Sequence, residues 1–309
     1  MSPERFTLPA HAKINLSLRV LGKRADGFHE IRTIFQTITL HDLLTFETRA
    51  GEGFELECTT EGIPVDETNL VTRAARALRE CYGVRKGARV MLEKRIPSQA
   101  GLGGGSTDAA AALLGLSRLW EIETTRVELD EIGARLGADV PFFFTGGTAL
   151  GTGLGTEITP LADVAERPLV VVMPDARVST VEAYKLLNAR TLTKPESPVN
   201  LPISRVEAQN SVSLYEDLRN DFEPVIFRLQ PEIERARDAL LAAGAQSALL
   251  AGSGASVFGI YENRAEAERA REVLARAEAG WQVFACETLS REGYMDALGA
   301  CARYVERGA

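Results

Sequence analysis

The stretch that decides the fold is Ile96-Pro97-Ser98-Gln99-Ala100-Gly101-Leu102-Gly103-Gly104-Gly105-Ser106-Thr107. Apolar alternation before it predicts a strand, and the Ala-rich sequence after it predicts a helix reaching about Trp120. Clustered glycines let a backbone turn its N–H groups inward, and the unpaired donors at a helix N-terminus attract anions. The stretch therefore predicts a cradle for phosphate groups.

Other interpretations of these glycines fit less well. A Walker A loop needs a lysine directly before Ser106, where this chain has Gly105. A dinucleotide-binding fingerprint needs a third glycine where Ser106 stands. A flexible connector that ends in a helix N-cap at Ser106 or Thr107 stays open, although so many glycines cost chain entropy.

The sequence before this loop is rich in expected strands. Apolar and polar residues alternate over 12–20, so Lys13 and Asn15 share the polar face of the first strand. Further strands are expected at 30–40, 43–48, 54–59 and 90–96, with a helix from Leu70 that Gly83 can end. After the loop, Thr125-x-x-Glu128 is a capping box for a helix that ends near Gly137.

The second half mixes strands and helices without regular alternation. Strands are expected at 169–173, 247–251, 256–261 and 281–287, and helices after Ser179, at 231–241 and at 264–279. Residues 191–202 are proline-rich and predict a surface loop. The fold class is therefore α+β with two domains, and the sparse region at 150–166 gives the boundaries 1–158 and 159–309.

Composition excludes several classes of protein. With 309 residues the chain buries a large core, and its formal charge of −8 argues against non-specific binding to nucleic acid. No apolar run approaches the ~20 residues that cross a bilayer. The four cysteines and three histidines lack metal-ligand or disulfide spacing. We expect a cytoplasmic protein without a structural metal, either a monomer or a weak homodimer.

Two further groups of residues have open interpretations. Gly252-Ser253-Gly254-Ala255-Ser256 lies between two apolar strands and can be a simple tight turn. Asp139 precedes Val140-Pro141-Phe142-Phe143-Phe144, so a carboxylate there needs a partner. Beside a lysine such as Lys13 it could accept a hydroxyl proton, but a turn or capping role remains the favoured interpretation from the residues alone.

Three separated motifs resemble those of the GHMP small-molecule kinases. They are Pro9-Ala10-His11-Ala12-Lys13-Ile14-Asn15-Leu16, Ala100–Ala110 and Ala251–Ser256, in the order of that family. The stretches Arg24-Ala25-Asp26-Gly27-Phe28-His29 and Gly137–Phe142 resemble the branch that phosphorylates a cytidylated sugar alcohol of the non-mevalonate isoprenoid pathway. The resemblance spans nearly the whole chain and is weakest over 188–215.

The resemblance implies both an architecture and a site. It implies a ribosomal-S5-like N-terminal domain, a ferredoxin-like C-terminal domain and an active site between them. ATP phosphates would lie on residues 97–107, Mg²⁺ would bridge them, and the C2 hydroxyl of the methylerythritol part would be phosphorylated. The implied roles are Asp139 as general base, Lys13 and Asn15 at the reacting end, Phe28, His29, Tyr184 and Thr180 around the cytosine, and Gly252 and Ser253 over the phosphates.

Two residues qualify that pattern. Ser106 is the natural hydroxyl to examine beside Mg²⁺. Asp108, at the start of the helix, would repel phosphate if it pointed inward, so we expect it to point away from ATP or toward the metal.

Two alternative functions remain at this point. Another GHMP kinase, of the homoserine or mevalonate type, would not need the aromatic residues Phe28, His29 and Tyr184. A non-catalytic nucleotide-binding or RNA-binding regulator could reuse the fold, but the net charge weighs against RNA. The presence of both Lys13 and Asp139 weighs against a protein without catalysis.

Overall fold

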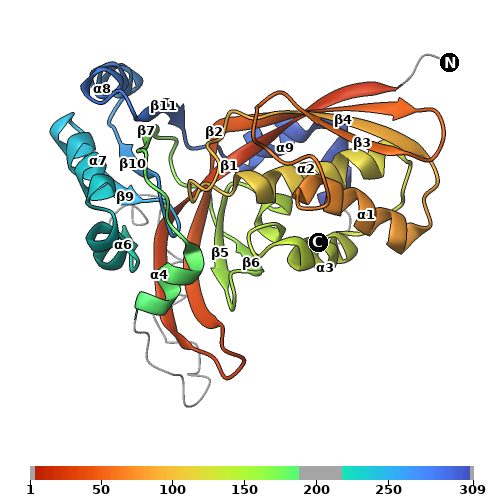
Figure 1. Cartoon of the computed structure of the whole chain (residues 1–309), viewed down its shortest axis with the longest axis horizontal. Helices are drawn as coiled ribbons and strands as arrows, with labels where there is room; N and C mark the ends of the chain where they lie inside the picture. The colour runs from red at the N-terminus through yellow and green to blue at the C-terminus, as the bar shows by residue number, and fades with distance from the viewer. Residues whose placement is uncertain (1–3, 188–217, 307–309) are drawn as a thin grey trace.

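The computed structural model describes residues 4–187 and 218–306 (Figure 1). The expected surface loop at 191–202 and the whole 188–215 stretch lie outside the described residues. The described chain contains two sheets with helices packed on them, so the α+β prediction is confirmed. None of the helices in these two ranges is both long and apolar enough to cross a membrane.

The larger sheet has seven strands. Its main path runs β3-β4-β2-β1-β8, and β5 pairs with β2 and β6. The strands are β1 (Arg5–Lys23), β2 (His29–Arg49), β3 (Phe54–Cys58), β4 (Gly87–Glu93), β5 (Thr148–Thr152), β6 (Glu157–Pro160) and β8 (Arg219–Asn220). The last of these comes from the second half of the chain and pairs in parallel with β1, which joins the two halves.

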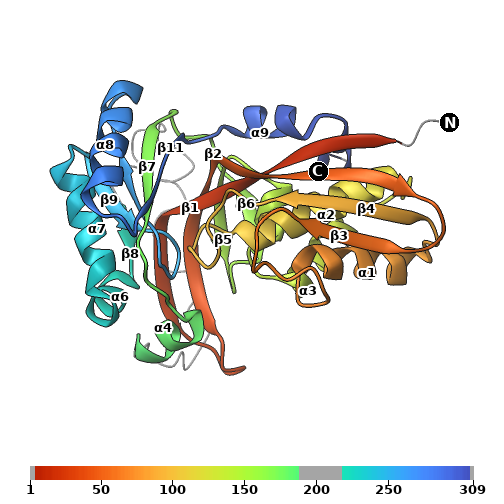
Figure 2. The ribbon, with the colours of Figure 1, turned by 45° about the horizontal axis from the view of Figure 1, so that its top comes forward.

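A long antiparallel hairpin of β1 and β2 is the backbone of this sheet. The sequence predicted strands at 12–20, 30–40 and 43–48, and the last two are one continuous strand. His41 and Asp42, which lay between the two predicted strands, both belong to β2, and the Asp42 side chain is buried. The hairpin extends from the first half of the molecule toward the second (Figures 1 and 2).

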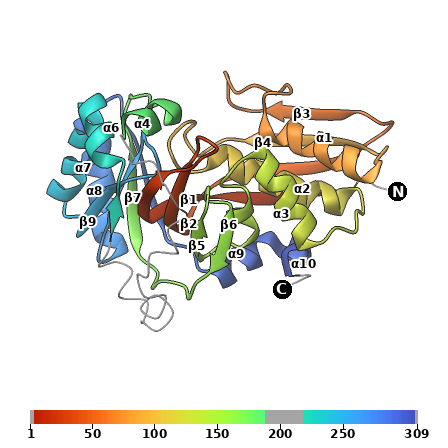
Figure 3. The same ribbon diagram turned by 90° about the horizontal axis from the view of Figure 1, so that it is seen from below.

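Three helices lie along one face of this sheet, as Figure 3 shows from below. They are α1 (Leu70–Tyr82), α2 (Gly104–Leu119) and α3 (Arg126–Leu136), and a 3₁₀ turn, η1 (Pro141–Phe144), follows them. Gly83 ends α1 in the left-handed conformation, with φ 63°, and both hydrogen bonds of the Thr125–Glu128 capping box are present. These local predictions are confirmed because each depends on neighbouring residues alone.

The smaller sheet has four antiparallel strands in the order β11-β7-β10-β9. Its strands and helices are β7 (Pro168–Met173), α4 (Thr180–Leu186), α6 (Glu223–Leu229), α7 (Pro231–Ala242), β9 (Ser247–Leu250), β10 (Val257–Ile260), α8 (Arg264–Ala277) and β11 (Gln282–Glu287). This strand order, with helices between β7 and β9 and between β10 and β11, is the ferredoxin-like arrangement that the resemblance implied.

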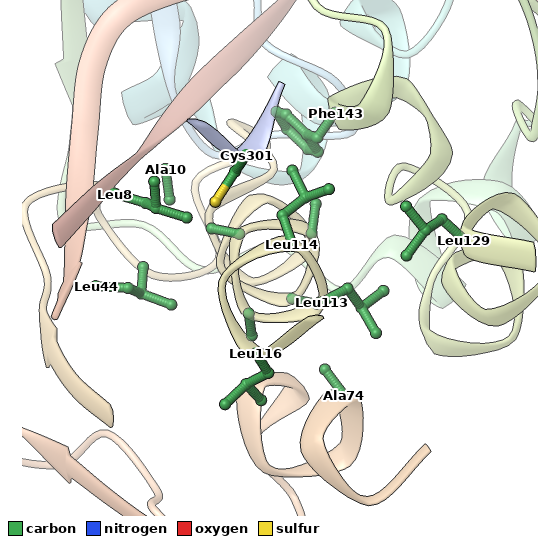
Figure 4. Packing of buried hydrophobic residues seen from close by; sticks show 14 of the residues in the cluster. Leu8, Ala10, Leu44, Ala74, Leu113, Leu114, Leu116, Leu129, Phe143 and Cys301 are labelled. Atoms are coloured by element: carbon green, nitrogen blue, oxygen red, sulfur yellow. The ribbon is translucent and has the colours of Figure 1, made fainter. Parts of the chain in front are cut away.

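The C-terminal segment returns to the first half of the molecule. It forms α9 (Arg291–Leu298), the 3₁₀ turn η3 (Gly299–Cys301) and α10 (Arg303–Glu306), which the sequence analysis did not predict. Tyr294, Leu298, Cys301 and Tyr304 are buried in the same core as α2. Figure 4 shows Cys301 beside Leu114 of α2 and Leu8 of β1. The domain boundary at residue 158 stays a prediction. The hydrophobic core around α2 contains side chains from before and from after that residue.

Candidate active site

A cleft of about 1370 Å³ opens between the two sheets. It contains residues from both halves of the chain, including many that the sequence singled out. Those that line it are Lys13, Asn15, Phe28, His29, Gln99, Gly101, Gly103, Ser106, Asp139, Thr180, Tyr184, Gly252 and Ser253. The fold therefore gathers in one place residues that are up to 240 positions apart, from Lys13 to Ser253.

An ion pair lies in the cleft. Lys13 Nζ is 3.2 Å from Asp139 Oδ2, and the exposed fractions of the two side chains are 5% and 32%. Lys13 comes from β1, whereas Asp139 comes from the turn between α3 and η1. The ammonium is thus fixed in the protein, while the carboxylate keeps an open face toward the cleft.

A chain of hydrogen bonds orients the Lys13 ammonium. It donates to Asn15 Oδ1 at 2.9 Å, and Asn15 Nδ2 donates to Thr33 Oγ1 at 2.7 Å. The Thr33 hydroxyl in turn donates to the Ser17 carbonyl at 2.8 Å. The ammonium also lies 5.4 Å from the centre of the Phe35 ring, a cation–π distance. Because Asn15 and Thr33 are buried, this arrangement holds the lysine in one direction.

The glycine-rich loop brings a helix N-terminus to the cleft. Gly103 precedes α2 with φ 72°, and no side chain caps the helix. The helical ladder begins with the bond from Thr107 N–H to the Gly103 carbonyl, so the amides of the first turn can face a ligand. Lys13 N–H donates to the Leu102 carbonyl at 2.9 Å, which fastens the loop to β1. This is the geometry of an anion site.

The loop residues do not all face the cleft. The side chains of Ala100, Leu102 and Thr107 are buried. Pro97 and Gly104 are partly buried, and Ser98 and Gly105 are exposed; none of the four lines the cleft. Any contact of these residues with a nucleotide would therefore depend on backbone groups or on movement of the loop.

A second turn packs against the glycine-rich loop. Ser256 N–H donates to the Ala100 carbonyl at 3.1 Å. A Cβ atom added to Gly101, whose φ is 77°, would lie only 2.0 Å from the Ala251 carbonyl oxygen. The hydroxyl of Ser253, in the same turn, lies 2.9 Å from the hydroxyl of Thr180 at the start of α4. The residues 251–256 thus close one side of the cleft, with backbone against backbone.

Two aromatic side chains meet at the other side of the cleft. The rings of His29 and Tyr184 stack with centres 4.8 Å apart, and Tyr184 also packs edge-on against Phe222. Burial, together with the nearby Asp139 charge, raises the pKa of Tyr184 to about 12. Burial and then Lys23 lower the pKa of His29, which favours the neutral imidazole. Phe28 is 62% exposed at the rim.

Asp108 points away from the cleft into a buried cluster of charges. Lys94 lies between Asp108, at 2.7 Å, and Asp42, in a closer contact. Asp42 also accepts the backbone N–H groups of Arg95 and Ile96, where the glycine-rich loop begins. Burial raises the pKa of Asp108 to about 8. This cluster joins the start of the loop to the start of α2.

Several residues that line the cleft were not predicted from the sequence. They include two cations, Lys23 and Lys185, and the ring of Phe222. Lys23 precedes the Arg24–His29 motif and Lys185 follows Tyr184, so adjacency to those motifs was the only signal for them. Phe222 had no signal, because its place depends on the pairing of β8 with β1.

Comparison with known sequences gives consistent results. The model of the GHMP kinases N terminal domain matches residues 69–147, and the GHMP kinases C terminal model matches 205–279. A 4-diphosphocytidyl-2-C-methyl-D-erythritol kinase of Prosthecochloris aestuarii is 41% identical over 88% of this chain and 94% of its own length. The enzyme of the same name from Moorella thermoacetica is 43% identical over 88% of this chain and 95% of its own length.

Solved structures divide into two levels of similarity. A homoserine kinase of Cytophaga hutchinsonii has a TM-score of 0.64 at 18% identity, covering 90% of this chain and 94% of its own, which shows a shared fold. A crystal structure of 4-(cytidine 5'-diphospho)-2C-methyl-D-erythritol kinase has a TM-score of 0.75 at 36% identity, covering 92% of this chain and 99% of its own. The chain therefore belongs to the 4-diphosphocytidyl-2-C-methyl-D-erythritol kinase family of the GHMP kinases.

Proposed function

We propose that this protein transfers the γ-phosphoryl group of ATP to the C2 hydroxyl of 4-diphosphocytidyl-2-C-methyl-D-erythritol, in the non-mevalonate isoprenoid pathway. The observation that carries the proposal is the buried Lys13 ammonium, 3.2 Å from the partly exposed Asp139 carboxylate in a cleft that also contains a helix N-terminus. The relatives named above catalyse, by their names, the phosphorylation of this substrate.

In this proposal Asp139 is the general base. Its carboxylate accepts the proton of the C2 hydroxyl as the oxygen attacks the γ-phosphorus and the bond to the ADP oxygen breaks. Lys13 holds the carboxylate and stabilises the negative charge near the reacting oxygen. Asn15 aligns Lys13 and contacts the same end of the substrate. Positioning and charge neutralisation carry most of the catalysis in such transfers.

The ATP phosphates are proposed to bind along residues 97–107. Backbone amides at the start of α2 face them, and Gly252 and Ser253 close over them from the opposite turn. Mg²⁺ would neutralise phosphate charge there, and the Ser106 hydroxyl, which lines the cleft, would be the protein group beside it. Asp108 has no part in that binding here, because its carboxylate is engaged with Lys94.

The cytidine part is proposed to bind at Phe28, His29, Thr180 and Tyr184. In the structure the His29 ring stacks on Tyr184. A cytosine ring that stacks between Phe28 and Tyr184 therefore has to displace the His29 ring from Tyr184. A flat aromatic face suffices for such stacking, whichever aromatic residue provides it. We retain the predictions of a cytoplasmic location and of a monomer or weak homodimer.

An activity assay tests the proposal directly. Purified protein with ATP and Mg²⁺ is supplied with the cytidylated substrate, homoserine or mevalonate in parallel, and ADP release is measured. Release with the cytidylated substrate alone supports the proposal. Release with either of the others overturns the assigned substrate, and ATP binding without any release favours a regulator.

Replacement of Asp139 tests the proposed base. Asp139→Asn keeps the size of the side chain and should lower kcat by about 10²–10⁴-fold, with substrate binding close to normal. Steady-state kinetics with both substrates measures the change. Activity within a few-fold of the parent protein would show that Asp139 is not the base.

A further inference from the structure

The segment Arg219–Glu223 contacts three parts of the cleft, namely strand β1, the turn at 251–256 and the ring of Tyr184. Its first two residues form β8, which pairs with Ser17 and Leu18 of β1. These two residues lie four and five positions after Lys13. Asp221 N–H donates to the Leu18 carbonyl at 2.9 Å, and its carboxylate accepts the Val20 N–H at 3.0 Å. The segment is thus attached to the strand that carries the catalytic ammonium of the proposed function.

Asn220 attaches the same segment to the turn at 251–256. Its side-chain amide donates to the carbonyls of Leu250, at 2.8 Å, and Gly252, at 2.7 Å. Its Oδ1 accepts the N–H of Phe222 at 3.0 Å, which fixes the direction of the amide. Asn220 is 3% exposed, so water cannot replace these bonds without a structural change.

The position of the turn at 251–256 determines which backbone groups face the glycine-rich loop. The Gly252 backbone is so close that an added Cβ would lie 2.9 Å from the Gly101 carbonyl oxygen and 3.4 Å from Lys13 Nζ. Glu223 supports the same turn, because its carboxylate accepts the Leu250 N–H at 2.9 Å. Phe222 extends the segment to the other side of the cleft through its contact with Tyr184.

We infer that Asn220 is a positioning residue for ATP. It holds the carbonyls of Leu250 and Gly252 so that the turn at 251–256 stays at a fixed distance from the glycine-rich loop and Lys13. The inference rests on the proposed function only in that the ligand between the two turns is a nucleotide phosphate. Phe222, two residues along, supports the cytidine side by its contact with the Tyr184 ring.

Two variants of Asn220 remove the hydrogen bonds that its side-chain amide donates and keep an acceptor for Phe222 N–H. Asn220→Asp keeps the acceptor for Phe222 N–H and places an oxygen against the two carbonyls. Asn220→Ser keeps a short acceptor and removes the amide without adding charge, so it serves if the first variant fails to fold. Each should weaken ATP binding by about tenfold or more, since two buried hydrogen bonds are lost. Arg219→Ala is the control, because among the described residues this exposed side chain forms its ion pair within the segment, with Asp221.

Titration calorimetry measures the Kd for ATP of the parent protein and of each variant. Steady-state kinetics then gives the KM values of the same proteins, provided that the parent protein is active. The inference predicts a raised Kd and KM for ATP in the Asn220 variants, an unchanged KM for the cytidylated substrate, and unchanged values in Arg219→Ala. A folded Asn220 variant that binds ATP like the parent protein refutes it. Equal rises in both KM values also refute it, because they indicate a general loss of structure. An inactive parent protein would overturn the proposed function, while the calorimetry would still test Asn220.

Discussion

The buried charge cluster beneath the glycine-rich loop yields a quantitative prediction. In the cluster, Lys94 is 8% exposed, Asp42 is fully buried and Asp108 is 5% exposed. Lys94→Met keeps the length of the side chain and removes the charge between two carboxylates. Asp42 then keeps its backbone donors, whereas Asp108, whose Oδ1 has no hydrogen-bond partner in the described structure, loses the ammonium that its Oδ2 contacts.

The expected cost is large because the charges are buried. Removing one partner of a buried ion pair costs about 3–5 kcal/mol, which for a chain of this length lowers Tm by roughly 5–8 °C. The loss should be greater at pH 8.5 than at pH 6. In the parent protein the pKa of Asp108 is raised to about 8, so this carboxyl becomes charged beside Lys94 over that interval. Without the ammonium, which lowers that pKa, the charged form is disfavoured further.

A matched surface variant controls for the loss of a lysine. Lys86 pairs with Glu121, and both side chains are more than half exposed, so Lys86→Met should change stability by less than about 1 kcal/mol. Urea and thermal unfolding of both variants give the comparison. If Lys94→Met lies within about 0.5 kcal/mol of Lys86→Met, the cluster does not stabilise the fold and the reasoning fails.

Three other predictions concern the pH dependence and the cleft. Burial, then the charge of His41, lowers the pKa of His11 from 6.5 to about 4, so the unfolded chain binds a proton first as pH falls. Stability should therefore decrease between pH 6.5 and 4, on the order of 3 kcal/mol, and His11→Gln should abolish this part of the slope in urea titrations. Gly101→Ala should abolish measurable ATP binding in calorimetry because its Cβ meets the Ala251 carbonyl, while Gly83→Ala, also at positive φ but with open space around it, should retain binding. Tyr184→Leu should raise KM for the cytidylated substrate and leave KM for ATP unchanged, and Tyr184→Phe should stay near the parent values; a change in kcat alone would contradict a stacking role.

Local signals in the sequence predicted much of the fold. The alternation around Lys13, the left-handed glycine after α1 and the Thr125–Glu128 capping box each act within a few residues, and the structure contains all three. The position of the glycine-rich loop before a helix was also predicted from local residues, because the clustered glycines directly precede the Ala-rich helix.

The missed features depend on residues far apart in the chain. Lys94 is 52 positions from Asp42 and 14 from Asp108, so no periodic pattern links the three charges. Asn220 meets its carbonyl partners 30 and 32 positions later. The stacking of His29 on Tyr184 was missed because the motifs indicated only that both rings belong to one site, and their mutual contact depends on how the two sheets pack.

The return of α9 and α10 to the first sheet has a consequence for biosynthesis. Residues 291–306 leave the ribosome only after the entire smaller sheet has been translated. Until then, the core that α2 and β1 share lacks Tyr294, Leu298 and Tyr304. The apolar side chains that these residues cover are open to water and to chaperones. The first half of the protein is therefore synthesised first, but its core is completed last. A stalled nascent chain would expose the apolar surface that α9 and α10 cover in the finished molecule.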